Sequence, residues 1–126
     1  MTIAPVLDAT ELAELGEQLG DLDALHRFVD RYATMLDQRV ERLDHALDAQ
    51  DLDDWQDAAL SLRTSSAMAG ATALSQLVRE AESYLVANPP WPRRDVQQDF
   101  MTGLRQLAAA TERELRSFLA QALATA

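Results

Sequence analysis

Few side chains in this 126-residue chain could carry covalent or metal chemistry. There is no cysteine, and the two histidines, His26 and His45, are nineteen positions apart, which disfavours a structural zinc site. On the helix expected around them, His45 faces away from the apolar positions and His26 lies at their edge, so ordinary surface and boundary roles are favoured. No nucleophile has an adjacent base, and no glycine-rich phosphate loop occurs. The sequence therefore predicts a protein that is not an enzyme and holds no metal and no cofactor.

A group of hydroxyl side chains lies in the middle of the chain, in the segment ALSLRTSSAMAG at residues 59–70. Ser61, Ser65 and Ser66 could be considered as nucleophiles. Serine within a helix usually donates its hydroxyl hydrogen to a carbonyl of the preceding turn, however, and this is the role expected for all three.

Composition favours helix throughout the chain. Alanine, leucine, glutamate, glutamine and arginine are abundant, and only four glycines and four prolines occur. Apolar residues recur at spacings of three and four, the pattern of amphipathic helices, and the prolines of Asn88-Pro89-Pro90-Trp91-Pro92 end one of them. We predict an all-α fold with helices from Asp8 to near Gly20, Asp21 to about Asp48, Asp51 to Gly70, about Thr72 to Ala87, and Asp95 nearly to the C-terminus.

The order and lengths of these helices predict their arrangement. A short helix followed by four longer ones with short connections is typical of an antiparallel four-helix bundle, with the additional N-terminal helix covering one end. Because 126 residues are the size of one domain, residues 1–126 are predicted to form a single helical domain.

The charge of the chain limits its partners. The formal net charge is −10, which repels phosphate backbones, so nucleic acid is not expected as a partner. No apolar run approaches the roughly 20 residues that span a bilayer, and no basic region followed by an apolar stretch opens the chain. We expect a monomer in the cytoplasm with no membrane contact.

The third predicted helix has one side for the core and one for solvent. At 100° per residue, Trp55, Ala59, Leu62, Ser66 and Ala69 share a face, while Leu60 points away from it. An exposed leucine forgoes about 1.5–3 kcal/mol of burial, although single exposed leucines are common. Beside it lie small side chains, which leave room for another helix to approach. An arginine, whose guanidinium group offers a rigid fork of hydrogen-bond donors, lies next to them. The alternative to an incidental surface leucine is a docking patch of Gln56, Leu60, Arg63, Thr64 and Ala67.

The same segment resembles the histidine phosphotransfer (HPt) family, helical bundles that carry a phosphoryl group on a histidine between receiver domains of response regulators. The family pattern is approximately A-H-x-L-K-G/S-S/A-S/A, with a glycine ten residues after the histidine. Leu60 stands where that histidine is expected. The residues that match in register are Ala59, Leu62, Arg63, Ser65, Ser66 and Gly70, with Arg63 replacing the usual lysine and Thr64 standing where a small residue is normal. The similarity extends to Leu7-Asp8, Leu19-Gly20-Asp21 and Asp51-Leu52-Asp53-Asp54-Trp55.

The resemblance implies a role in bacterial two-component signalling without phosphate transfer. Leucine has no lone pair to offer an aspartyl phosphate, so Leu60 cannot be a phosphoacceptor. The family's receiver recognition rests on apolar and small side chains around the histidine, and these are largely present. A pseudo-phosphotransfer protein that binds a response-regulator receiver domain or a histidine kinase is therefore expected, with Arg63 near the receiver's acidic pocket or its aspartyl phosphate.

Two other functions stay open at the level of sequence. The chain could be an ordinary histidine phosphotransfer carrier that a substitution at Leu60 has inactivated. It could also be a structural, self-associating helical bundle in which Leu60 belongs to a homodimer interface.

Overall fold

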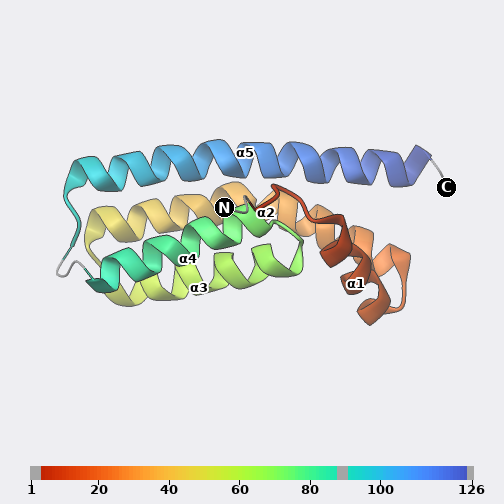
Figure 1. Ribbon diagram of the computed structural model, residues 1–126, viewed down its shortest axis with the longest axis horizontal. Coiled ribbons are helices and arrows are strands. Elements are labelled where there is room, and N and C mark those ends of the chain that lie inside the picture. Colours follow the sequence, from red (N-terminus) through yellow and green to blue (C-terminus); the bar gives the residue numbers. More distant parts are fainter. Residues whose placement is uncertain (1–3, 88–90, 125–126) are drawn as a thin grey trace.

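The computed structural model describes residues 4–87 and 91–124, and these residues form α-helices and connections without a β-strand (Figure 1). The all-α prediction is confirmed. The predicted helix stop at Asn88, Pro89 and Pro90 lies outside the described residues. The helices are α1 (Ala9–Leu19), α2 (Leu22–Ala49), α3 (Leu52–Met68), α4 (Thr72–Ala87) and α5 (Arg94–Ala124).

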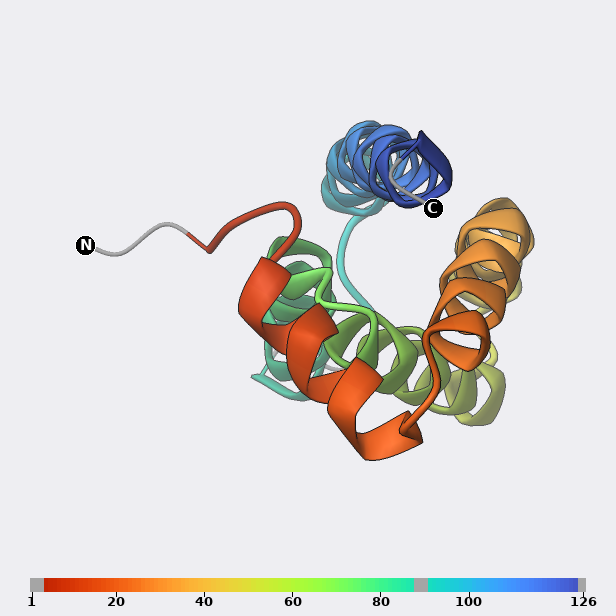
Figure 2. The same ribbon diagram turned by 90° about the vertical axis from the view of Figure 1, so that its right-hand side faces the viewer.

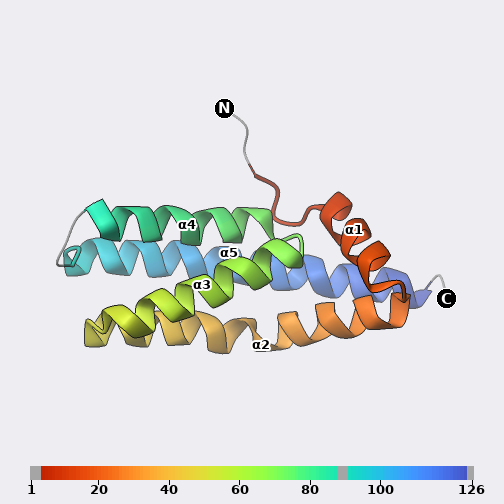
Figure 3. The ribbon, with the colours of Figure 1, turned by 90° about the horizontal axis from the view of Figure 1, so that it is seen from below.

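Helices α2 to α5 form an antiparallel four-helix bundle. Viewed along its long axis, α2 lies between α3 and α5, and α4 closes the other side between the same two helices (Figure 2). Helices α3 and α5 are therefore diagonally opposite. Helices α2 and α5, with 28 and 31 residues, extend past α3 and α4, and α1 packs across this end against α2 and α3 (Figure 3).

Aspartates begin three of the helices. The carboxylates of Asp8, Asp21 and Asp51 accept hydrogen bonds from backbone N–H groups of the first turns of α1, α2 and α3, at 2.9, 2.9 and 3.1 Å. These bonds satisfy amides that have no partner within the helix. The last helix departs from the prediction, because α5 begins at Arg94 and Asp95 lies inside its first turn.

The core is built mainly on α2. Eight apolar residues recur along this helix at spacings of three and four, and seven of them are buried and pack toward α3 and α5. The buried ones are Leu25, Val29, Tyr32, Leu36, Val40, Leu43 and Leu47. Leu22 is the exception, with 68% of its surface exposed. Leu22 is the first residue of α2. This turn of α2 extends beyond the end of α3 and the start of α4, so neither helix covers it (Figure 1).

A buried hydrogen bond joins α2 to α3. The hydroxyl groups of Tyr32 and Ser66 lie 2.6 Å apart, and both residues are buried. Burial raises the pKa of Tyr32 to about 12, because a phenolate would lose its hydration there; the bond to Ser66 and the charge of Arg39 oppose this shift less strongly.

The turn between α3 and α4 is held by the segment that precedes α1. The amide of Asp8 donates to the carbonyl of Gly70 at 2.7 Å, and the amide of Ala73 donates to the carbonyl of Pro5 at 2.9 Å. Gly70 has a φ of 76°, and a Cβ atom on it would lie 2.7 Å from the Asp8 carbonyl oxygen. Only glycine fits this position without displacing the backbone of the N-terminal segment.

The variant Gly70→Ala is expected to lower the free energy of unfolding by at least about 1–2 kcal/mol, from the left-handed backbone alone. The overlap with Asp8 adds to this loss. Gly103→Ala is the matched control, because Gly103 lies inside α5 with open space around the Cβ position, and it should gain roughly 0.5–1 kcal/mol. Urea unfolding measures both; equal stabilities of the two variants would contradict the proposed fit at Gly70.

The buried Tyr32 predicts a loss of stability at high pH. Its folded pKa of about 12 lies above the ordinary value of 10.0, so its contribution is complete below pH 10 and is lost as the pH rises toward 12. Between about pH 9 and 11 the native chain should lose roughly 1 kcal/mol more than Tyr32→Phe. The chain has no lysine to titrate in this interval, so urea unfolding at the two pH values isolates tyrosine. An equal loss of unfolding free energy in both proteins would contradict the raised pKa of Tyr32.

Candidate functional site

Helix α3 presents one side to the core and the other to solvent. Trp55, Ala59, Leu62 and Ser66 are buried, as the helical period predicts. The indole of Trp55 also meets the ring of Phe100 on α5 edge-on, with centroids 6.2 Å apart. The buried side fixes the rotation of α3 about its axis.

The opposite side carries the residues predicted for docking. Gln56, Leu60, Thr64 and Ala67 are all exposed, and Arg63 is half-buried at their edge. With Met68, the first four form one continuous exposed strip, which we call the α3 face. The structure therefore brings the predicted docking residues together on one helix.

Leu60 lies at the middle of the α3 face with 49% of its surface exposed. Thr64, one turn further, donates its hydroxyl hydrogen to the carbonyl of Leu60 at 2.7 Å, so this hydroxyl is used within the helix.

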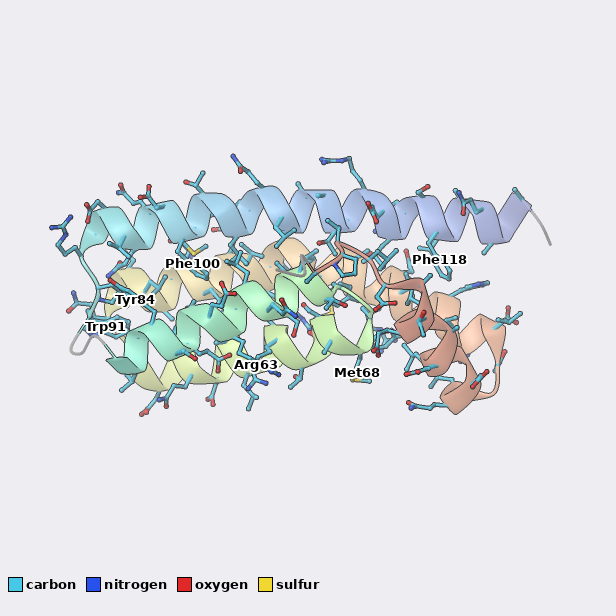
Figure 4. All side chains as sticks on the ribbon, in the orientation of Figure 1. Arg63, Met68, Tyr84, Trp91, Phe100 and Phe118 are labelled. Atoms are coloured by element: carbon cyan, nitrogen blue, oxygen red, sulfur yellow. The ribbon has the colours of Figure 1, made fainter. Side chains whose placement is uncertain are left out.

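Met68 is a member of the α3 face that sequence analysis did not single out. It ends α3, is 52% exposed, and lies beside α1 (Figure 4). Met68 follows Leu60 by eight residues and Thr64 by four, and this spacing could have placed it on the same side of the helix. Methionine is flexible and polarizable, and it adapts well to partner surfaces.

Arg63 is held by a neighbouring helix. Its Nε atom donates to Oε1 of Glu82 on α4 at 2.7 Å, and the two side chains are 24% and 27% exposed. Arg63 therefore has an intramolecular partner and is not a freely solvated helix arginine. This ion pair joins α3 to α4 and sets the direction of the guanidinium group at the edge of the α3 face.

The hydroxyl groups near Leu60 are used within the fold. Ser65 donates to the carbonyl of Ser61 at 2.7 Å and accepts from Arg39 on α2. Ser66 is buried against Tyr32. The predicted bond to a carbonyl of the preceding turn is confirmed for Ser65, whereas the hydroxyl of Ser66 instead pairs with Tyr32 on another helix.

The histidines lie on α2, as expected, and not on α3. His26 is half-buried, with its ring edge-on to Phe118 on α5 at a centroid distance of 6.1 Å. His45 is exposed. Across the part of the chain that the structure describes, no group of three or more metal-ligating side chains gathers.

Within residues 4–87 and 91–124, none of the helices combines the length and the apolar character needed to cross a bilayer.

Comparison with known proteins identifies the family. No curated protein and no solved structure matches this chain. The model of the Hpt domain family matches residues 27–124, more than three quarters of the chain, and this match spans α2 from its second turn to the end of α5. Hpt domains carry phosphoryl groups in phosphorelays and interact with receiver domains or kinases. This chain belongs to the Hpt domain family.

Proposed function

We propose that this protein is a pseudo-phosphotransfer domain: it docks a receiver domain or a histidine kinase on the α3 face and carries no phosphoryl group itself. The observation that carries the proposal is Leu60, an exposed leucine at the centre of the face and at the position where the family motif has histidine.

Phosphoryl transfer between these proteins requires a nucleophilic nitrogen. An imidazole attacks the phosphorus of an aspartyl phosphate, and its lone pair forms the new bond. The side chain of Leu60 has no such electron pair. His26 packs against Phe118 and His45 is on α2, so neither belongs to the α3 face.

Docking does not depend on that nitrogen. Leu60 and Met68 are exposed apolar side chains, and Thr64 and Ala67 between them are short, which lets a partner helix approach closely. Burying an exposed leucine contributes about 1.5–3 kcal/mol, so replacing a polar imidazole with leucine strengthens an apolar contact. The α3 face is therefore suited to binding even though it cannot react.

The inactivated carrier remains the second candidate, because position 60 is exposed and most of the motif around it matches the family pattern. Arg63 is directed toward the edge of the face by Glu82, and the neighbouring positions are small. An imidazole at position 60 would be exposed to a partner in the same way as the leucine is. The two candidates differ in whether the native chain binds.

The variant Leu60→Asp is expected to weaken binding to a receiver domain by roughly tenfold or more, because a carboxylate would be buried at the centre of an apolar contact. Calorimetry against receiver domains of the source organism measures this. Ala109→Asp is the control, since it adds the same charge at an exposed position of α5, diagonally opposite α3, and should leave affinity unchanged. Equal affinities of native chain and Leu60→Asp would place docking elsewhere.

The variant Leu60→His is expected to acquire a phosphoryl label that native chain lacks. After incubation with a receiver domain phosphorylated with ³²P, Leu60→His should carry acid-labile label, as a phosphohistidine does, and Leu60→Gln should carry none. Label on the native chain would contradict the proposal. Binding by Leu60→His together with no binding by the native chain would favour the inactivated carrier instead.

A further inference from the structure

A hollow lies between α1 and the end of α3, next to the α3 face. It has a volume of about 260 Å³ and brings α1 side chains against Ala67 and Met68. Its lining residues are Glu11, Glu14, Leu15, Gln18, Ala67 and Met68. The α3 face therefore borders α1 at Ala67 and Met68.

A second hollow, of about 200 Å³, lies on the other side of Ala67 and extends toward α4. Glu11 and Ala67 line both hollows, so the two lie side by side. Arg79 of α4 lines the far side of the second one. A partner seated on the α3 face would meet a ridge of apolar and small side chains with a depression on each side.

The two edges of this surface differ in charge. Helix α1 contains three glutamates and no basic residue. Glu11 and Glu14 are exposed, and among the residues that the structure describes neither takes part in an ion pair. The α1 edge is thus negative, while the α4 edge carries the cation Arg79, which lines the second hollow together with Glu11.

We propose that α1 is the second half of the docking surface, and that Glu11 and Glu14 select partners that carry lysine or arginine beside an apolar docking segment. This inference rests on the proposed function and deepens it. The family match begins at residue 27, so α1 lies outside the matched residues. The occupant is a receiver domain whose basic edge lies over α1. Arg79 fixes its orientation, because the opposite orientation would bring the basic edge of the receiver against Arg79 on α4.

Charges at the edge of an interface act mainly on the rate of association. They attract an oppositely charged partner before contact, and salt screens this attraction over about 10 Å at 0.1 M. The apolar contacts of Leu60 and Met68 act mainly on the rate of dissociation. The two contributions can therefore be separated kinetically.

The test uses the full chain and a panel of receiver domains from the source organism, with association and dissociation rates measured at low and high salt. For the receiver that the native chain binds, Glu11→Gln/Glu14→Gln should slow association about three- to tenfold at low salt, with little change at high salt. The control Glu17→Gln/Glu114→Gln removes the same charge from an α1 position outside the hollows and from α5, and should change the association rate much less.

The outcomes separate this inference from the proposed function. Slower association of the Glu11 and Glu14 variant, with the control near native, supports selection by α1. Equal rates for the two double variants, while Leu60→Asp still weakens binding, overturn the selection and leave docking on α3 standing. If the native chain binds no receiver domain of the panel, the proposed function fails and the inference fails with it.

Discussion

The burial of one side of α3 is the constraint on which the rest of this structure depends. Trp55, Ala59, Leu62 and Ser66 face the core, so a helix of 100° per residue must turn Leu60 to solvent. Rotating α3 far enough to bury Leu60 would expose Leu62, at a cost of about 1.5–3 kcal/mol, and would break the bond between Tyr32 and Ser66. The core therefore decides which residues a partner meets, whichever side chain occupies position 60. On the proposed function, a chain of the Hpt family that lacks the reactive histidine keeps the surface around that position, because the buried side of α3 is unchanged.

The arginines explain where the negative charge of the chain remains free. Arg94, Arg105 and Arg116 are spaced by eleven residues, about three helical turns, and all three reach from α5 to acidic residues of α2. Arg42 joins α2 to α3, and Arg63 joins α3 to α4. Each exposed pair contributes little to stability. Together they pair with six acidic residues of the bundle, whereas among the described residues the glutamates of α1, like Asp53 and Asp57 on α3, take part in no ion pair. An acidic edge beside the α3 face follows from this distribution.

Much of the fold could be predicted from the sequence because its signals are local. Aspartates mark the starts of helices, and Gly70, which has a positive φ, follows the end of α3. The predicted bounds of α4 agree with the structure. The period of α3 was enough to place Leu60 and its neighbours in solvent. The contacts that sequence reasoning missed are long-range. Arg63 with Glu82, Tyr32 with Ser66, and the N-terminal segment on Gly70 depend on the rotation and offset of separate helices, which no local pattern encodes. The exposure of Leu22 and Met68 likewise depends on where neighbouring helices end.

The central claim is that the α3 face binds a receiver domain without receiving its phosphoryl group. The most direct measurement is nuclear magnetic resonance of the ¹⁵N-labelled chain during titration with a phosphorylated receiver domain, followed in parallel by the ³¹P spectrum. We predict shifted amide signals that cluster on residues 56–68, and a ³¹P spectrum without a phosphorus–nitrogen signal. Amide shifts confined to the α2 and α5 side of the bundle, or a phosphorylated nitrogen on the native chain, would contradict the account.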